Sequence, residues 1–441
     1  MPCELCKVCT VEEWLGASTA LIHTTGVGGR SMIDAGNTAW VLTSAALVML
    51  MTPALGFFYG GLVSRKNVLS TIMHSFFILA LISVVWVLWG YTLVFGPDKG
   101  GIIGGLDYIG LRGIAPGDIY SEATGIPVFA FIAFQMMFAA ITPALITGAF
   151  AERKRFKAFV VFSILWSTLV YAPLAHWVWG GGWLAEFGAI DFAGGTVIHI
   201  SSGVAALVAA MVLGRRKTFG TKETDPHDLT MTVLGAGLLW FGWFGFNAGS
   251  ALAANGQAAS AFLVTTIAAS MGALTWMTVS WMRHGHPSVL GAAAGAVGGL
   301  VGITPAAGFV GPAAALVIGF GAGVFCFFTV DLLKQRLKID DALDVFAVHG
   351  VGGIWGALAT GLFADAAYSG GEGVGFDGLF FGNPELLWNQ VVATGAAIAF
   401  SGAATFVILK AINLVIPLRV EEDAEVLGLD SSQHGEVAYQ I

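Results

Sequence analysis

Two histidines in long apolar runs are the residues of this sequence whose types and placement most directly suggest chemistry. His199 lies in DFAGGTVIHI (191–200), and His349 lies in DVFAVHGVGG (344–353). A neutral imidazole carries one hydrogen-bond donor and one acceptor, so two rings in contact can share a proton. Burial and mutual repulsion disfavour charging both rings together. Such a pair suits a small neutral solute or a relayed proton; the alternative is two unrelated histidines, each bonded to a backbone carbonyl.

A second group of residues could receive a small cation. Phe134 and Phe138 have the i,i+4 spacing of one helix face. Trp179 lies in HWVWGGGW, Ser250 lies in FGFNAGS, and Phe246 is a further aromatic that could plug a path. An aromatic face attracts a cation within about 6 Å, with a gain of about 0.5–2 kcal/mol, and a hydroxyl adds one directed hydrogen bond. Together they predict a site for a cation that donates hydrogen bonds, although each aromatic alone fits ordinary packing.

Acidic residues precede both histidines. Asp191 begins an apolar run, where it could cap backbone amides, worth about 1 kcal/mol, or act as an electrostatic or proton-handling group. Asp344 is predicted to cap its own run in the same way. Five other histidines are expected to be interfacial or exposed, and no role is predicted for them. They are His176, His227, His284, His286 and His434.

The composition places these residues in a membrane protein. The 441 residues are 56% hydrophobic and 11% charged, with a mean hydropathy of +0.80, whereas about a quarter of a soluble domain is charged. No basic tract suggests nucleic acid. No metal-ligand cluster, nucleophile elbow or P-loop stands in a water-accessible stretch, so an enzyme is not expected. Neither a metal nor an organic cofactor is predicted.

Eleven apolar runs are long enough to cross a bilayer as helices. A hydrocarbon core about 30 Å thick needs about 20 helical residues, and backbone groups in lipid need internal partners. Run length and the lack of alternation exclude a β-barrel. The predicted spans are 38–62, 69–95, 127–150, 157–178, 192–213, 229–249, 258–281, 288–304, 311–333, 344–363 and 390–416.

The distribution of Lys and Arg predicts the orientation of these spans. One set of alternate connections, with the C-terminal end, holds 16 of the 20 Lys and Arg; the other side holds Lys7, Arg30, Lys99 and Arg112. The positive-inside rule then places the N-terminus outside and the C-terminus in the cytoplasm, as an odd number of spans requires. Eleven spans divide into two five-helix halves and one final span. The halves would be inverted repeats, each with a histidine in its fifth helix, which is a transporter architecture.

The cysteines are concentrated at the N-terminus. Cys3, Cys6 and Cys9 form CxxCxxC. An iron–sulfur centre would need a fourth nearby ligand, so a disulfide between two of the three is the expectation. Cys326 lies in an apolar run and is expected to be inert. The N-terminus lacks the basic and apolar regions of an ordinary signal peptide.

Several longer motifs link these features. They are FYGGLVSRKNVLS, GAFAERKRF, YAPLAHWVWGGGWLAEFGAIDFAGGTVIHI, GWFGFNAGSA, DDALDVFAVHGVGG and GLDSSQHGEVAY. Together they resemble the ammonium transporter family (Amt/Mep, related to Rh proteins) over roughly residues 35 to 441, whereas residues 10–30 and CxxCxxC match no motif of it. The resemblance implies a homotrimer of eleven-helix subunits in the cell membrane, each with its own pore for ammonium and, by extension, methylammonium.

The resemblance also implies roles for the residues singled out above. Phe138 and Phe246 resemble a paired phenylalanine gate, and Asp191 matches the family's essential aspartate. His199 and His349 match twin histidines of a narrow pore. The external ammonium-recruitment site is expected at Phe134, Phe138, Trp179 and Ser250.

These expectations define three regions and one mechanism. Residues 1–34 are expected to be extracytoplasmic, 35–416 to form the transmembrane domain, and 417–441 to be a cytoplasmic tail. The mechanism would recruit ammonium, deprotonate it and conduct ammonia past the histidines with a coupled proton path. The resemblance adds a PII-type signalling protein as a cytoplasmic partner. An ammonium sensor of the same fold that conducts little, and a Rh-type neutral gas channel, remain as alternatives.

Overall fold

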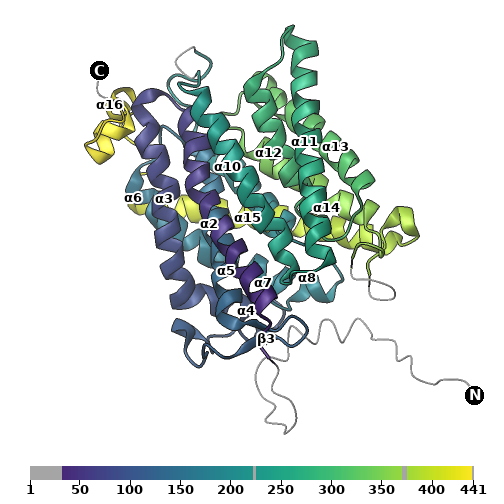
Figure 1. Ribbon diagram of the computed structural model, residues 1–441. Helices are drawn as coiled ribbons and strands as arrows, with labels where there is room; N and C mark the ends of the chain where they lie inside the picture. The colour runs from purple at the N-terminus through teal and green to yellow at the C-terminus, as the bar shows by residue number, and fades with distance from the viewer. Residues whose placement is uncertain (1–31, 222–224, 370–374, 440–441) are drawn as a thin grey trace, which may run out of the picture.

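Long apolar helices run between the two ends of the molecule (Figure 1). The computed structural model describes residues 32–221, 225–369 and 375–439. CxxCxxC, and with it the predicted disulfide and most of the predicted 1–34 segment, lies outside these residues. The α-helices are α2 (Ala35–Leu62), α3 (Val68–Val85), α4 (Tyr91–Phe95), α5 (Val128–Ile146), α6 (Phe156–Trp166), α7 (Ala172–Trp179), α8 (Trp183–Glu186), α9 (Ser201–Leu213), α10 (Leu229–Ala248), α11 (Gly256–His284), α12 (Val289–Ile303), α13 (Pro312–Asp331), α14 (Gly352–Phe363), α15 (Pro384–Val415) and α16 (Glu422–Leu427).

Short helical segments of other types interrupt or extend these helices. The 3-10 segments are η1 (Arg65–Asn67), η3 (Ile109–Leu111), η4 (Thr147–Phe150), η8 (Gly249–Ala251) and η11 (Leu379–Phe381). The π-helical segments are η2 (Trp86–Gly90), η5 (Ser167–Tyr171), η6 (Gly195–Ile200), η9 (Leu332–Leu337), η10 (Phe346–Val351) and η12 (Asp430–His434).

Two small antiparallel hairpins lie between α4 and α5. Strand β1 (Asp98–Lys99) pairs with β2 (Ile103–Gly104), with Asp98 opposite Gly104. Strand β3 (Ile119–Ser121) pairs with β4 (Ile126–Pro127), with Ile119 opposite Pro127. The backbone amide of Asp34, which caps α2, donates to the carbonyl of Gly125 at 2.9 Å. The hairpins therefore lie at the end of the bundle where α2 begins.

Ten helical segments in the described part of the chain are long and apolar enough to cross a membrane. They correspond to ten of the eleven predicted spans. The eighth predicted span, 288–304, is the 15-residue α12, which is about 22 Å long at 1.5 Å per residue. The boundaries differ most at the last span, which begins at Pro384, and at the fourth, which continues through α8 to Glu186.

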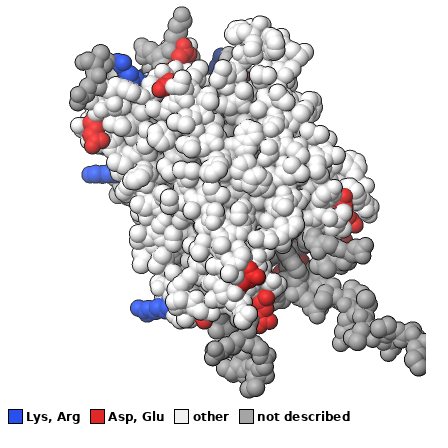
Figure 2. All heavy atoms as spheres, viewed as in Figure 1, with Lys and Arg blue, Asp and Glu red and all other residues white. Residues whose placement is uncertain are grey.

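The surface matches that of a multi-pass membrane protein. In Figure 2 most charged side chains lie toward the two ends, and the broad middle of the visible face has almost none. Large apolar side chains are exposed on several helices, including Phe241 on α10, Phe320 on α13 and Val407 on α15. Apolar exposure on this scale indicates a lipid or protein environment rather than water.

Helix contacts pair the first and fifth segments of the two predicted halves. Helix α10 packs along α2. Helix α9 and η6 pack against η10 and α14. Because α9 with η6 holds His199 and η10 with α14 holds His349, this packing brings the two histidine segments together in the interior.

A buried ionic network closes the opposite end of the bundle. The Arg216 guanidinium donates to Glu152 at 2.6 Å and to Asp340 at 2.8 Å, and all three side chains are buried. Burial alone would raise the pKa of each carboxyl group, but Arg216 holds the pKa of Glu152 and of Asp340 below the ordinary value. The network joins the loops before α6, after α9 and before η10.

The C-terminal tail lies across this same end. The Asp430 carboxylate accepts the backbone amides of Leu69 at 3.1 Å and Ser70 at 2.7 Å, at the start of α3. Arg419 forms an ion pair with Glu425 at 2.7 Å. Helix α16 lies at the end of the molecule opposite to the start of α2 (Figure 1).

Candidate functional site

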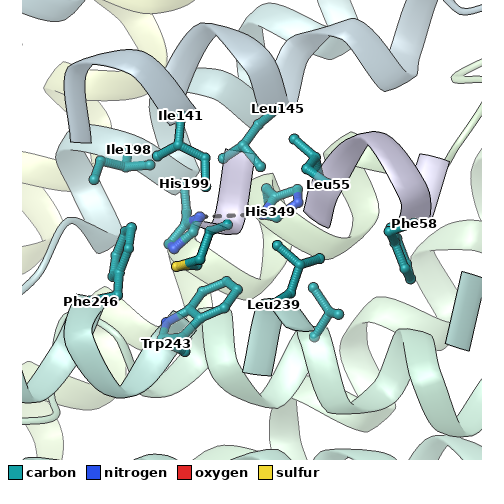
Figure 3. A pocket seen from close by; sticks show the side chains of 12 residues that line it. Leu55, Phe58, Ile141, Leu145, Ile198, His199, Leu239, Trp243, Phe246 and His349 are labelled. Atoms are coloured by element: carbon teal, nitrogen blue, oxygen red, sulfur yellow. Dashed lines mark hydrogen bonds between the residues drawn. The ribbon is translucent and has the colours of Figure 1, made fainter. Parts of the chain in front are cut away.

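His199 and His349 meet in the middle of the bundle. Their Nδ1 atoms are 3.2 Å apart, and the two rings are nearly parallel, at 16°, with centroids 5.2 Å apart. Both side chains are buried. Figure 3 shows the two rings facing one another across this contact. Since only one hydrogen can occupy the space between two nitrogens at this distance, one ring donates and the other accepts.

An apolar cavity surrounds this pair. It gives the centre of a water-sized molecule about 10 Å³, close to the space that one water needs. The Nε2 atom of His199 is buried and has no hydrogen-bond partner. The cavity is lined by Met51, Leu55, Phe58, Ile141, Leu145, Ile198, His199, Leu239, Trp243, Phe246, Val297 and His349 (Figure 3). The lining of this cavity is therefore apolar except for three rings that carry nitrogen, the two imidazoles and the indole of Trp243.

Each histidine lies on a π-helical segment. Such segments are rare in proteins overall, but they occur frequently at functional sites. His199 is in η6 and His349 is in η10. The Asp191 carboxylate accepts four backbone amides at the start of η6, from residues 194–197, at 2.7–3.1 Å. Asp341 accepts the amide of Phe346 in η10 at 2.7 Å. Each aspartate precedes its histidine by eight residues, since 199 − 191 and 349 − 341 are both 8.

The cap predicted at Asp344 is therefore wrong. The Asp344 carboxylate instead pairs with Lys334 at 2.8 Å, and its backbone has φ of +61°. Asp341 takes the capping position because a carboxylate three residues earlier reaches the free amides of the π-helical turn. Burial and the neighbouring Asp344 raise the pKa of Asp341 to about 7.

Glycines set the separation of the two histidine segments. A Cβ at Gly203 would overlap the backbone N and Cα of Gly350, and one at Gly353 would lie 3.0 Å from the Cβ of His199. Gly203 and Gly353 each follow a histidine by four residues, one helical turn. The two segments can approach to hydrogen-bonding distance because neither glycine carries a side chain.

Aromatic rings extend from the histidines toward the end of the bundle where α2 begins. His199 stacks on Trp243, with centroids 5.5 Å apart, and on Phe246, at 5.9 Å. Phe246 contacts Phe138 at 4.5 Å, and both rings are buried. These two rings, from α10 and α5, connect His199 to Trp179 through a series of ring contacts.

The outer aromatic group is also brought together. Phe134 contacts Phe138 at 4.7 Å, and Phe138 contacts Trp179 at 6.2 Å. The Trp179 indole donates to the backbone carbonyl of Asp191 at 2.8 Å. The Ser250 hydroxyl donates to the carbonyl of Phe246 at 2.8 Å, so its oxygen retains acceptor capacity.

Asp191 has the geometry of a cap, which is one of the two roles that the sequence leaves open. Each carboxylate oxygen accepts two backbone amides, and the side chain is buried. Burial raises the pKa of the Asp191 carboxyl, and the four backbone hydrogen bonds oppose this rise. A direct role in proton transfer remains a proposal.

Sequence reasoning missed three positioning residues. Trp243, which stacks on His199 and donates to Thr304 at 2.9 Å, stands three residues before Phe246, one turn along the same helix face. Asp341 precedes His349 by eight residues, the same spacing by which Asp191 precedes His199. His176, expected to be interfacial or exposed, is fully buried and bonded through both ring nitrogens.

No group of three or more His, Cys, Asp and Glu residues that could hold a metal occurs within residues 32–221, 225–369 and 375–439. Cys326 is buried and free. The apolar helices, the uncharged middle of the surface and the buried histidine pair define a multi-pass membrane protein with a candidate internal pathway.

Comparison with known proteins identifies its family. A family model described as Ammonium Transporter Family matches residues 39–439, and the chain belongs to that family. An ammonium transporter of Bacillus subtilis is 54% identical over 407 residues, covering 92% of this chain and 98% of that protein. Ammonium transporter Amt1 of Archaeoglobus fulgidus is 48% identical over 404 residues, covering 92% and 99%.

Solved structures with the same fold include Mep2 and a sensor Amt protein. Saccharomyces cerevisiae Mep2 matches with a TM-score of 0.84 at 38% identity, covering 94% of this chain and 95% of that one. A structure titled "Sensor Amt Protein" matches with a TM-score of 0.82 at 28% identity, covering 90% and 98%.

Proposed function

We propose that this protein is an electrogenic ammonium transporter. It recruits the cation at the outer aromatic residues, removes a proton and conducts ammonia past His199 and His349, while the proton follows a coupled path. The single observation that carries the proposal is the buried Nδ1–Nδ1 contact of 3.2 Å, which lies in an apolar cavity directly beneath the Phe138–Phe246 contact. The relatives named ammonium transporter support the substrate.

Recruitment uses rings and one hydroxyl. Trp179 and Phe138 offer negative ring faces, and the Ser250 oxygen has acceptor capacity for a donated N–H. Phe134 packs beside Phe138 and supports it. The Trp179 indole donates to the backbone carbonyl of Asp191, and the carboxylate of the same residue, when ionised, adds a negative charge that favours a cation at the entrance.

Selectivity follows from the apolar pathway. Ammonium and potassium carry the same charge and have similar sizes, so a pore that selected by size would admit both. A charged group in an apolar membrane interior costs at least several kcal/mol. Ammonium can leave a proton behind and enter as ammonia, whereas potassium cannot. Phe138 and Phe246 block a hydrated ion, and the cavity below them accepts one molecule the size of water.

The histidines give ammonia a polar contact and the proton a route. The shared hydrogen between the two Nδ1 atoms can lie on either ring. When it lies on His199, the Nε2 atom of that ring is an acceptor facing the cavity; when it lies on His349, that Nε2 is a donor. A proton taken up at one Nε2, movement of the shared hydrogen between the Nδ1 atoms, and release of the proton from the other Nε2 together carry one proton past the pair.

The finer architecture is part of the same proposal. Eleven spans, with α12 as the eighth, would form two inverted five-helix repeats and a final α15, with the N-terminus outside and the C-terminus in the cytoplasm. The matched spacings of Asp191 with His199 and Asp341 with His349 support the repeat. We further propose a homotrimer in the plasma membrane, with the basic loops and the tail as the face for a PII-type partner.

A sensor of the same fold is the second candidate function. The structural likeness to a sensor Amt protein favours retaining it, because the fold alone does not separate binding from conduction. The two functions differ in whether charge crosses the membrane.

Current recording with purified protein in supported membranes tests the proposal. An ammonium pulse should give a saturable inward positive current, and an equal potassium pulse should give none. Tight ammonium binding without current would favour a sensor. Ammonium-driven uptake without charge movement would indicate a neutral gas channel.

A further inference from the structure

Three hydrogen bonds join the β1–β2 hairpin to the end of α7 and the start of α8. The Trp177 indole donates to the carbonyl of Ile102 at 2.8 Å, and the amide of Trp183 donates to the carbonyl of Gly101 at 3.0 Å. The third bond joins His176 Nε2 to Asp98 Oδ1 at 2.8 Å. The hairpin and the last turn of α7 therefore form one packed unit at the outer end.

His176 has acceptors at both ring nitrogens. Its Nδ1 atom lies 2.6 Å from the carbonyl oxygen of Val94, which can only accept. Its Nε2 atom faces the Asp98 carboxylate. Partial burial works to raise the pKa of Asp98, but the hydrogen bonds from His176 and Gly101 hold it below its ordinary value. With Asp98 ionised, both ring nitrogens face acceptors, and only the doubly protonated imidazolium donates to both.

This imidazolium lies one turn before the outer site. Trp179 follows His176 by three residues on α7, and its indole reaches the carbonyl of Asp191. The end of α7 packs closely against α4. A Cβ at Gly180, which follows α7, would overlap the carbonyl oxygen of Val94. A change in the bonds of His176 therefore displaces the turn that presents Trp179.

We propose that protonated His176, held between Val94 and Asp98, is a positioning residue that sets Trp179 for cation recruitment. The inference rests on the proposed function, since it assigns Trp179 to the ammonium site. Loss of one proton from His176 would leave a ring nitrogen lone pair facing either the Asp98 carboxylate or the Val94 carbonyl, and the contact between the hairpin and α7 would weaken. Ammonium affinity at the outer site should therefore depend on the proton on His176.

The surroundings of His176 single out Asp98. The elements packed against α7 are η5, α4, α8, β2 and η6. The titratable residues on these elements are Tyr171, Tyr91, Glu186 and His199. Strand β1 adds two charged residues, Asp98 and Lys99. Of all these residues, only Asp98 forms a described hydrogen bond with the His176 ring.

The test compares His176→Gln and Asp98→Asn with Asp107→Asn, which changes an exposed acid of the same loop. The NH4+ concentration for half-maximal current and the maximal current are recorded from about pH 5 to 9, a range that spans histidine titration. His176→Gln should raise the half-maximal concentration about tenfold, equivalent to about 1.4 kcal/mol, and change the maximal current less than about twofold. Asp107→Asn should match the wild type.

Asp98→Asn separates positioning from a merely structural role. Its amide can donate to an unprotonated Nε2 while Nδ1 continues to donate to Val94. This variant should therefore keep the wild-type affinity at low pH and lose the rise in half-maximal concentration at high pH. An unchanged affinity and pH profile in His176→Gln, or a wild-type pH profile in Asp98→Asn, would overturn the inference.

Hydrogen exchange distinguishes this failure from failure of the proposed function. In the wild type, the exchange rate of the amides of residues 98–104 should rise with pH by more than the intrinsic exchange rate does. In Asp98→Asn, the two rates should rise in parallel. A wild-type protein without current would overturn the proposed function, and the exchange result would still show whether the proton on His176 fastens the hairpin. Equal exchange in both proteins would overturn the inference whatever the current.

Discussion

The two central imidazoles are held by contacts that fix their planes as well as their positions. Trp243 stacks on His199 at 19°, and its indole nitrogen is bonded to Thr304. The His349 ring lies at 16° to the His199 ring, and their Nδ1 atoms are 3.2 Å apart. A ring fixed in this way keeps its Nδ1 atom pointed at its partner, so little reorganisation accompanies movement of the shared hydrogen.

Asp341 provides a prediction at the same scale. Its pKa is raised from 3.8 to about 7 by burial and by Asp344. Between these values the unfolded carboxyl is ionised while the folded one stays protonated, so the free energy of unfolding falls as pH rises and levels off above about pH 7. Asp341→Asn should remove this loss, which amounts to up to about 4 kcal/mol at 1.4 kcal/mol per pH unit.

Thermal unfolding in detergent at a series of pH values checks this expectation. The variant should gain stability relative to the wild type between about pH 4 and 7. The exposed Asp107→Asn substitution is the control and should follow the wild type. A constant difference between Asp341→Asn and the wild type across this range would contradict the assignment.

At the scale of elements, the crossing of α9 and η10 depends on Gly203. A methyl group there would overlap the backbone of Gly350 and push His199 and His349 apart. Gly203→Ala should therefore abolish ammonium current and cost about 1–3 kcal/mol of unfolding free energy, as overpacking does.

Gly237→Ala is the matched control for this substitution. Gly237 also lies inside a helix, α10, but a Cβ there meets nothing within 4 Å. Alanine should stabilise that helix by up to about 1 kcal/mol and leave the current unchanged. Wild-type current in Gly203→Ala would show that the close crossing is not required.

Most spans were predictable from the sequence because lipid imposes a length and an apolar composition on each. The start of α15 at Pro384 was missed by six residues, since its first turns hold Glu385 and Asn389 and are not uniformly apolar. The π-helical form of η6 and η10 was not predictable, because it depends on tertiary packing and on an aspartate eight residues before each histidine.

The candidate site was predictable to a different degree. Motifs indicated the aromatic residues and both histidines, and the structure brings them into one connected series of ring contacts. The sequence does not distinguish Asp341 from Asp344 as the cap of η10, because both precede His349. The choice depends on which carboxylate reaches the free backbone amides in the folded protein.

For the whole molecule, Arg216 joins segments that are distant in sequence. It bonds Glu152 from the loop before α6 and Asp340 from the loop before η10, and so links the two predicted halves. Removing one partner of a buried ionic network costs about 3–5 kcal/mol, because the remaining charges lose their compensation. Arg216→Ala should lower the free energy of unfolding by this amount.

Arg283→Ala offers the matched control, because Arg283 pairs with Asp331 at 3.0 Å on the surface. An exposed pair contributes less than about 1 kcal/mol. Chemical unfolding followed by tryptophan fluorescence measures both variants. Equal losses for Arg216→Ala and Arg283→Ala would contradict the role given to the buried network.

The central claim is that His199 and His349 conduct ammonia and relay its proton. The most direct test is the ammonium-evoked current of the His199→Ala/His349→Ala double variant in supported membranes, with potassium pulses throughout and the exposed His286→Ala as control. The account predicts loss of the selective current in the double variant, with normal folding and a wild-type response in the control. A full, ammonium-selective current in the double variant would contradict it.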